Sequence, residues 1–220
     1  ARKDPAFLIE WIDSFYARDI LELFGSRNRQ GFLALFRLLL RQSGGQLDYS
    51  RLANLSEMSR VTVKAHIEAM QIAHVVHLLR PFHGGGKREI VSRPKCYAFD
   101  TGFVTFEKGW DTIRSDDRGL LWEHLVLDSL RFHYADEDIS YWQDKSRREI
   151  DFVIRRERDR VDVVECKINP DRLDATAAEA FRALYPAGDN YVVSPAVKTP
   201  TRLRRGELVF TACNTGDFPL

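Results

Sequence analysis

Polar residues that could do chemistry cluster in one stretch of the chain, from Arg147 to Lys167. The first half of this stretch carries Glu149 and Asp151, and its end carries Glu165 and Lys167. Because side chains alternate along a β-strand, residues two positions apart share a face, so each pair is expected to act together. Three carboxylates and an amine beside apolar residues are costly to place without a partner, and a divalent cation is the usual one. The spacing therefore predicts a metal-binding site.

The apolar residues of the same stretch predict the two strands that must hold this site. In the first strand they alternate with the acids, and in the second they are nearly continuous: Ile150, Phe152, Ile154, Val161, Val163 and Val164. Such apolar runs are typical of a sheet that helices cover. The charged residues between the two runs predict a turn that joins the strands as a hairpin.

The elements around this hairpin predict an α/β fold with a mixed sheet, of α+β type, flanked by helices. A helix is expected over residues 117–134, with Glu123 among its apolar positions, after a charged loop that follows Gly102. The other expected elements are strands over 138–143, 191–193 and 207–211 and a helix from about 173 to 184. His124 is expected on the helix surface, and Trp11, Trp110, Trp122 and Trp142 are expected in the core.

The first hundred residues predict a helical domain with a winged helix-turn-helix. Helical spacing of apolar residues predicts helices over 6–24 and about 29–42. A short helix near Asp48 and a longer one capped by Ser59 are joined by a turn near Ser56, as a helix-turn-helix requires. Strands over 75–82 and 94–100 are expected to flank a flexible basic tip.

The start of the second helix of this pair and the basic tip are the expected nucleic-acid contacts. The candidate residues are Arg60, Thr62, Lys64, His66, Lys87 and Arg88. The alternative is a packing module that contacts no nucleic acid, because such helices also serve as spacers between proteins. The glycines before Lys87 do not form a phosphate loop, since Pro81 stands where the first glycine is required and Arg88 follows the lysine.

Composition and charge limit the class of protein. With 44% hydrophobic content, the 220 residues can bury one large core or two small ones, which excludes a disordered chain. Residues 1–100 hold 15 Lys and Arg against 10 Asp and Glu (+5), whereas residues 101–220 hold 18 against 22 (−4), so the first part favours an anionic partner. No apolar run reaches the roughly 18 residues that span a bilayer. The three cysteines are far apart and form no CxxC pair, which fits a reducing cytoplasm and predicts neither disulfides nor zinc.

Glu123 in a helix, Asp151 in a strand, and Glu165-Cys166-Lys167 at the end of the next strand resemble the PD-(D/E)XK nuclease superfamily, whose members bind Mg²⁺ and cut phosphodiesters. The resemblance implies an αβββαβ domain that acts as a phosphodiesterase dependent on Mg²⁺ or Mn²⁺. Its catalytic residues would be Asp151, Glu165, Lys167 and Glu123, and its metal ligands the three acids with the backbone carbonyl of Cys166. Lys167 would orient or deprotonate the attacking water, or stabilise the transition state as a charge.

Glu149, Arg147 and Arg148 lie beside this set, and two interpretations of them stay open. In the first, Glu149 is a further carboxylate of the site and the two arginines hold phosphates. In the second, the three residues form a solvated turn with its own salt bridges.

A second resemblance covers nearly the whole chain. The segments that carry it are FYARDI, LLRPF, RPKCYAFDTGF, LLWEHLV, REIDFVI and VVECK, together with the helix-turn-helix. They are similar to the C-terminal half of a bacterial and archaeal family of ATP-binding proteins, in which an AAA-type ATPase precedes a domain of unknown function. No Walker motif occurs in this sequence, so ATP binding is expected only in an ATPase domain outside this chain. The opening ARKDP, without Met, likewise predicts a piece of a longer protein.

These features predict two domains, a helical winged helix-turn-helix over 1–102 and a PD-(D/E)XK nuclease-like domain over 103–220. Two functions stay open: a divalent-metal-dependent nuclease module that binds duplex DNA, and a catalytically inactive scaffold with the same fold that binds nucleic acid or a protein partner. A third hypothesis is a toxin or defence component that acts on RNA, since no residue separates DNA from RNA. The sequence does not fix the oligomeric state.

Overall fold

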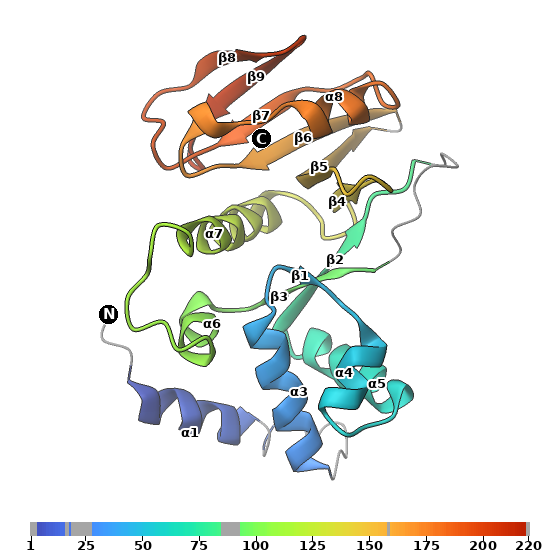
Figure 1. Ribbon diagram of the computed structural model, residues 1–220, viewed down its shortest axis with the longest axis vertical. Helices are drawn as coiled ribbons and strands as arrows, with labels where there is room; N and C mark the ends of the chain where they lie inside the picture. The colour runs from blue at the N-terminus through green and yellow to red at the C-terminus, as the bar shows by residue number, and fades with distance from the viewer. Residues whose placement is uncertain (1–3, 16–17, 19–27, 85–92, 158, 219–220) are drawn as a thin grey trace. The chain divides into compact units, whose positions relative to one another are not determined.

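The computed structural model describes residues 4–15, 18, 28–84, 93–157 and 159–218, and it divides into two compact units (Figure 1). Unit 1 comprises Ala1–Leu78 and Arg93–Ile113, and unit 2 comprises Leu79–Ser92 and Arg114–Leu220. Among the described residues, none of the helices is both long and apolar enough to cross a membrane.

Unit 1 is built mainly of helices. These are α1 (Pro5–Phe15), α3 (Arg29–Arg41), α4 (Tyr49–Leu55), α5 (Arg60–Ile72) and α6 (Thr101–Glu107). A short strand β1 (Gly45–Gln46) pairs antiparallel with β3 (Lys95–Ala98), and the next strand in the sheet order is β2 (Val76–Pro81), which begins in this unit. The predicted helices are thus present, although α1 is described only as far as Phe15.

The apolar face of α3 forms the centre of unit 1, as its sequence predicts. Phe32, Leu35, Phe36 and Leu39 recur at helical spacing, and all four are buried. Because burial of apolar surface is the main favourable term in folding, this face holds the neighbouring helices in place. Helix α4 packs against α3 within this core.

The two helices of the predicted helix-turn-helix are present as α4 and α5, and capping side chains fix their starts. The Asp48 carboxylate accepts hydrogen bonds from the backbone N–H groups of Ser50 and Arg51 at the start of α4. The Ser59 hydroxyl accepts one from Thr62 N at 3.1 Å at the start of α5. These side chains satisfy donors that a helix start leaves without a partner, and so they fix where each helix begins.

The prediction of a charged loop after Gly102 is wrong for the first part of that segment, because its residues form α6. The Asp100 carboxylate caps this helix by accepting a hydrogen bond from Gly102 N, and Phe103 and Val104 are buried. The cap and two apolar residues are enough for a short helix that packs on α3. The predicted division of the chain between residues 102 and 103 falls inside this helix.

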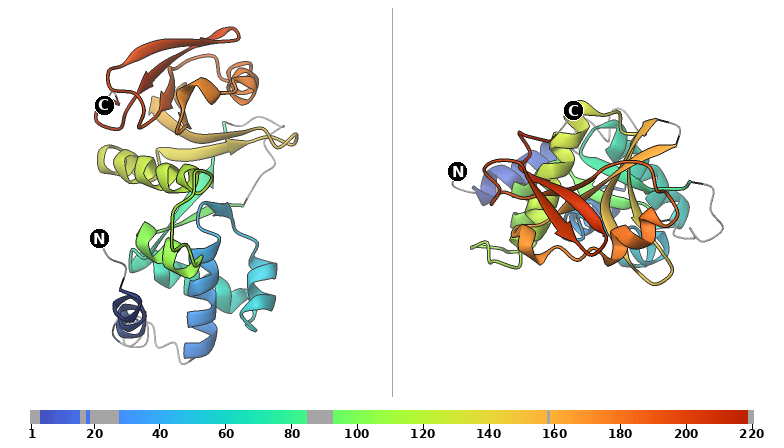
Figure 2. Two further views of the ribbon diagram at one scale, coloured as in Figure 1. Left: turned by 60° about the vertical axis from the view of Figure 1, so that its left-hand side comes forward. Right: turned by 90° about the horizontal axis from the view of Figure 1, so that it is seen from above.

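Unit 2 is a mixed sheet with helices (Figure 2). Its elements are α7 (Arg118–His133), β4 (Ile139–Gln143), β5 (Glu149–Glu157), β6 (Arg160–Cys166), α8 (Thr176–Arg182), β7 (Asn190–Val193), β8 (Thr201–Arg205) and β9 (Leu208–Cys213). From the end of β2 the strand order is β2-β4-β5-β6-β7-β9-β8. The β4–β5, β5–β6 and β8–β9 pairs are antiparallel, and β2–β4, β6–β7 and β7–β9 are parallel. The mixed α/β prediction is confirmed.

Two elements of unit 2 differ from the prediction. Strand β8 was not predicted, because its sequence TRLRR is an exposed edge strand without the apolar alternation that identifies a half-buried one. The helix predicted from about 173 to 184 is shorter, since a 3-10 turn over Pro170–Arg172 and a loop precede α8.

One face of the unit 2 sheet carries an apolar core against α8. Trp142, Val153, Val163 and Phe181 are buried in it, among other residues. Arg182 at the end of α8 donates hydrogen bonds to the carbonyl oxygens of residues 161, 185, 187 and 189, which ties the loop before β7 to β6. This loop therefore sets where β7 begins beside β6.

Two glycines offer a test of this arrangement, and we expect Gly188→Ala and Gly119→Ala to have opposite effects on stability. Gly188 has φ +129, and an added Cβ would lie 1.9 Å from the Val161 carbonyl oxygen, so alanine is expected to destabilise the protein by about 2 kcal/mol or more. Gly119 in α7 has no atom within 4 Å of an added Cβ, so alanine there is expected to stabilise by about 0.5 kcal/mol. Chemical denaturation measures both, and a neutral Gly188→Ala would contradict the described loop.

Candidate functional site

Three of the predicted site residues converge at the ends of β5 and β6. The Lys167 ammonium donates a hydrogen bond to Glu165 Oε2 at 2.7 Å and lies 3.4 Å from Asp151 Oδ2. The same Asp151 oxygen accepts a hydrogen bond from the backbone N–H of Cys166 at 2.7 Å. The structure therefore brings two acids and the lysine together as the spacing predicts, while their roles stay predictions.

A bulge in the pairing of β4 with β5 helps to place Asp151. Ser140 pairs with Val153 and Trp142 with Ile150, so one residue of β4 stands opposite two residues of β5, namely 151 and 152. A bulge of this kind bends the strand and re-aims a side chain, and it is frequent beside active sites. The period of two in the sequence gives no sign of it.

Helix α7 approaches the same corner of the sheet through Trp122. The indole N–H donates a hydrogen bond to the carbonyl oxygen of Val193 on β7 at 2.9 Å. Glu123 is the next residue of the helix, and it is close enough to the site that its charge contributes to raising the pKa of the Cys166 thiol. The helical acid is thus brought within electrostatic reach of the predicted set.

Burial controls the charge of Glu165. This side chain is 4% exposed, and the loss of hydration together with the nearby charge of Asp151 raises its pKa to about 8. The positive charge of Lys167 opposes this shift without cancelling it. Two acids share one lysine, so the cluster favours any further positive charge placed beside it.

The lysine and the cysteine of the site respond differently to burial. Burial alone would lower the pKa of Lys167, but the charges of Asp151 and Glu165 and the hydrogen bond to Glu165 outweigh it, and the net shift is upward. Burial, and then the charges of Asp151 and Glu123, raise the pKa of the Cys166 thiol. At neutral pH the lysine is therefore an ammonium, and the cysteine is a neutral thiol with no thiolate to offer.

The residues fit a hard divalent cation in ligand type, although they are not arranged as a complete cage. Among the described residues, no group of three or more His, Cys, Asp and Glu side chains stands close enough to hold a metal ion. Mg²⁺ is commonly bound through one or two carboxylates, with water and substrate phosphates completing its shell. Asp151 and Glu165 supply that number of acids, and Glu123 would have to approach further to become a direct ligand.

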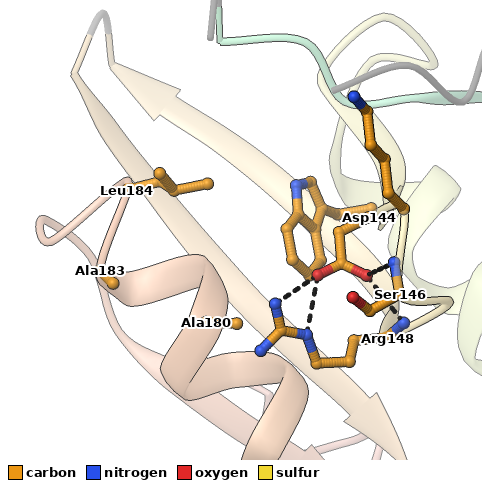
Figure 3. A pocket seen from close by; sticks show the side chains of 8 residues that line it. Asp144, Ser146, Arg148, Ala180, Ala183 and Leu184 are labelled. Carbon is orange, nitrogen blue, oxygen red and sulfur yellow. Dashed lines mark hydrogen bonds and ion pairs between the residues drawn. The ribbon is translucent and has the colours of Figure 1, made fainter. Parts of the chain in front are cut away.

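Glu149 and Arg148 beside the β4–β5 turn have partners of their own, and Arg147 is exposed. Gln143 Nε2 donates a hydrogen bond to Glu149 Oε2 at 2.7 Å across the two strands. Arg148 forms an ion pair with Asp144, whose carboxylate also accepts backbone hydrogen bonds within the turn (Figure 3). Arg147 is exposed and has a left-handed backbone, with φ 62. These contacts favour the interpretation of this segment as a turn with its own salt bridge.

A pocket of about 480 Å³ lies between this turn and the end of α8 (Figure 3). Its lining residues are Trp142, Asp144, Lys145, Ser146, Arg148, Ala180, Ala183 and Leu184. None of the converging acids, nor the lysine, is among them. The pocket is therefore separate from the acid cluster, and we assign the chemistry to the cluster because its charged groups are held together by direct contacts.

The predicted nucleic-acid contacts of unit 1 divide by exposure. Arg60 and Lys64 are exposed on α5, whereas the Thr62 hydroxyl is hydrogen-bonded to that of Ser59 at 2.8 Å. The prediction for His66 is corrected, because this side chain is buried beside Phe32, and burial lowers its pKa. The predicted basic tip with Lys87 and Arg88 lies outside the described residues.

Two further residues of α7 differ from expectation. His124 was expected on the helix surface but is 3% exposed, because the helix buries one side that the apolar spacing alone did not identify. Trp122 was treated as a core residue, and its hydrogen bond to Val193 was missed because the partner is 71 positions away. The only sequence feature that could have pointed to a role of Trp122 in the site is its position next to Glu123 in the motif WEH.

The fold and the site together define a mixed α/β unit with a partly buried cluster of two acids and one lysine, preceded in the chain by a helical unit with a helix-turn-helix pair. Residues 1–113, just over half of the chain, match the family described as a domain of unknown function, DUF8612. The chain belongs to this family. Residues 118–213 match a second domain of unknown function, DUF4143.

Curated relatives come from bacteria and archaea, and they are longer than this chain. Uncharacterised proteins of Mycobacterium bovis and Mycobacterium tuberculosis are each 29% identical over 150 residues, which is 66% of this chain and 34% of those proteins. An uncharacterised protein of Methanocaldococcus jannaschii is 25% identical over 153 residues, which is 67% of this chain and 33% of that protein. The chain thus spans about one third of the length of the relatives that it matches.

Two solved structures are weakly similar. The transcriptional regulator SlyA has a TM-score of 0.26 at 15% identity, covering 60% of this chain and 92% of its own. A half-complex of Thermococcus gammatolerans McrB AAA+ hexamers with bound McrC has a TM-score of 0.32 at 13% identity, covering 82% of this chain and 46% of its own. At these scores neither structure defines the fold or the function of the chain.

The raised pKa of Glu165 predicts how stability depends on pH in the absence of metal. A carboxyl whose pKa is higher in the folded state stabilises the protein fully below about pH 4.5, and this contribution is lost as the pH rises to about 8. We therefore expect Glu165→Gln, which mimics the protonated acid, to gain at least about 3 °C in Tm relative to the unsubstituted chain between pH 5 and pH 8.5.

Differential scanning calorimetry at both pH values measures this effect. Glu207→Gln is the matched control, because Glu207 is exposed and the same change should show no gain with pH. An equal Tm difference at both pH values for Glu165→Gln would contradict the assigned environment of this acid.

Proposed function

We propose that this chain is a divalent-metal-dependent nuclease module, in which unit 2 hydrolyses phosphodiester bonds and unit 1 binds DNA. The observation that carries this proposal is the convergence of Asp151, Glu165 and Lys167 from two adjacent strands, with Lys167 in contact with both acids. It is the combination that the PD-(D/E)XK resemblance requires, with Glu123 nearby on the preceding helix. A protein of purely structural role has no evident need to bury Glu165 beside a second acid at one strand end.

In this mechanism the residues of the chain bind, orient and stabilise. Bound Mg²⁺ or Mn²⁺ supplies Lewis acidity toward the scissile phosphate and lowers the pKa of an attacking water. Asp151 and Glu165 would hold the ion through their carboxylate oxygens, while Glu123 would act directly or through water. The backbone carbonyl of Cys166 remains a candidate ligand. The N–H of the same residue orients Asp151 through a hydrogen bond to its carboxylate.

Lys167 is best suited to act as a fixed positive charge. Its upward pKa shift means that it keeps its proton at neutral pH, so it would not take a proton from the attacking water. With a cation held by the two acids, the Lys167 ammonium would be free to turn toward the phosphate and would stabilise the negative charge that develops there. Of the roles predicted for this residue, we therefore retain those of orienting and stabilising.

Binding of nucleic acid is assigned to unit 1 through α5. The exposed Arg60 and Lys64 lie on the second helix of the helix-turn-helix pair, close to its start, where such helices commonly meet the major groove. The excess of five positive charges in residues 1–100 supports an anionic partner. We propose duplex DNA as that partner.

The same module would work beside an ATPase in the full-length protein. Residues 118–213 match a domain that is commonly found with AAA-type ATPases, and this chain spans about one third of its relatives. We propose that an AAA-type domain elsewhere in the protein binds ATP and drives or gates the activity of unit 2.

The second candidate function is a scaffold that keeps the fold but does not cut. The observation in its favour is the close contact of Lys167 with both acids, which gives each of them a positive partner without any metal. Such a scaffold would bind nucleic acid or a protein partner through the same surfaces. Cleavage assays separate it from the nuclease.

We expect the purified chain to cleave DNA only with Mg²⁺ or Mn²⁺, and Asp151→Asn and Lys167→Met to lower the cleavage rate by at least about a hundredfold. Asparagine and methionine keep the shape of each side chain but remove the charge that the mechanism needs. Gel assays on plasmid, linear and branched DNA measure the rate.

Lys198→Met is the matched control, because Lys198 is exposed and far along the chain from the acids. Cleavage that persists in Asp151→Asn or without divalent ions would point to a contaminant. Binding without cleavage in the unsubstituted chain would favour the scaffold.

The assignment of DNA binding to α5 predicts a loss of phosphate contacts on substitution. We expect Arg60→Ala and Lys64→Ala each to weaken binding at low salt and to reduce the slope of log K against log salt by about 1. Fluorescence anisotropy with labelled duplex at several salt concentrations measures both quantities. Arg114→Ala removes an exposed arginine outside α5 and should leave the slope unchanged, so equal effects of all three substitutions would contradict the assignment.

A further inference from the structure

One backbone carbonyl of β7 receives hydrogen bonds from two parts of the candidate site. The Val193 oxygen accepts the indole N–H of Trp122 at 2.9 Å and the backbone N–H of Lys167 at 3.1 Å. A carbonyl oxygen has two lone pairs, so it can take both donors. The helix that carries Glu123 and the chain at Lys167 are therefore fixed at the same point.

The register of β6 and β7 shows why this point matters. Cys166 is the last residue of β6 and pairs with Val193, and Lys167 follows it outside the strand. The bond from Lys167 N to the Val193 oxygen thus holds the lysine backbone beside the acids, and just beyond it the Ser194 hydroxyl donates to the Ile168 carbonyl oxygen at 3.0 Å. A residue at the end of a strand is prone to fray, and a second donor on the same oxygen restrains the acceptor.

We propose that Trp122 is a positioning residue, whose indole N–H holds Glu123 and Lys167 in place around Asp151 and Glu165. This inference rests on the proposed function, because it gives the tryptophan a role in the same site. Trp122 does not touch the reacting atoms in this proposal, and it acts through the two residues that it anchors.

A second tryptophan supplies a matched comparison for the packing role of an indole. Trp142 is 2% exposed, and its Nε1 has no hydrogen-bond partner within the part of the chain that the structure describes. Replacing it by phenylalanine removes the same atoms as at Trp122 and leaves a cavity, but it breaks no hydrogen bond to Val193. Loss of packing and loss of the anchor can therefore be told apart.

The first test measures the anchor itself and does not depend on activity. Hydrogen exchange followed by NMR reports how often the Lys167 amide opens. We expect Trp122→Phe to speed exchange at Lys167 by about tenfold, and Trp142→Phe to lower the Tm but leave that amide close to its original rate. An unchanged Lys167 rate in Trp122→Phe would overturn the proposal, and so would an equal increase in both variants.

The second test asks whether the anchor serves catalysis. In cleavage assays below the Tm of each variant, Trp122→Phe should lower kcat by about tenfold with little change in KM for DNA, since the indole does not contact substrate. Combined with Glu123→Gln, the loss should be less than the product of the two single losses, because both act through the same acid. Multiplicative losses would overturn the positioning role.

The two proposals fail in different ways. A chain that cleaves no DNA with Mg²⁺ or Mn²⁺ refutes the nuclease, while amide exchange still decides whether Trp122 anchors Lys167. If the Trp122→Phe variant cleaves DNA at the rate of the unsubstituted chain, the positioning role is refuted, while the nuclease proposal still holds.

Discussion

The structure of unit 2 depends on one electrostatic constraint, which is that a buried carboxylate, Glu165, and a half-buried one, Asp151, share a single ammonium at the end of a strand pair. Lys167 satisfies Glu165 and Asp151 at 2.7 and 3.4 Å, yet the pKa of Glu165 is still raised to about 8. The cluster is costly to fold around unless a further positive charge becomes available. We interpret that cost as the reason for a functional site, because stability alone would favour apolar residues at these positions.

Much of this site follows from the sequence, because the period of two in a strand links residues that act together. The pairs Glu149 with Asp151 and Glu165 with Lys167 required only that alternation. That alternation could not predict three other features. The bulge opposite Tyr141 and the hydrogen bond from Trp122 depend on contacts between distant segments, and β8 is an exposed edge strand. Helix α6 was missed for another reason, because a cap and two apolar residues among charges give a weak periodic signal.

The helical unit and the sheet unit divide the proposed work by their charge and their surfaces. Unit 1 has its capped helix pair and exposed cations on α5, which suit a phosphate backbone but offer no group for catalysis. Unit 2 holds the acids and has a separate pocket beside α8. Under the proposed function, unit 1 would hold the DNA and unit 2 would cut it.

The central claim is that Asp151 and Glu165 form a site for a divalent cation, and isothermal titration calorimetry with Mn²⁺ at pH 7 tests it most directly. The account predicts one ion bound per chain, with protons released on binding because Glu165 must give up its proton, and no binding in Asp151→Asn. The absence of binding up to about 10 mM Mn²⁺, or equal binding by the variant, would contradict it.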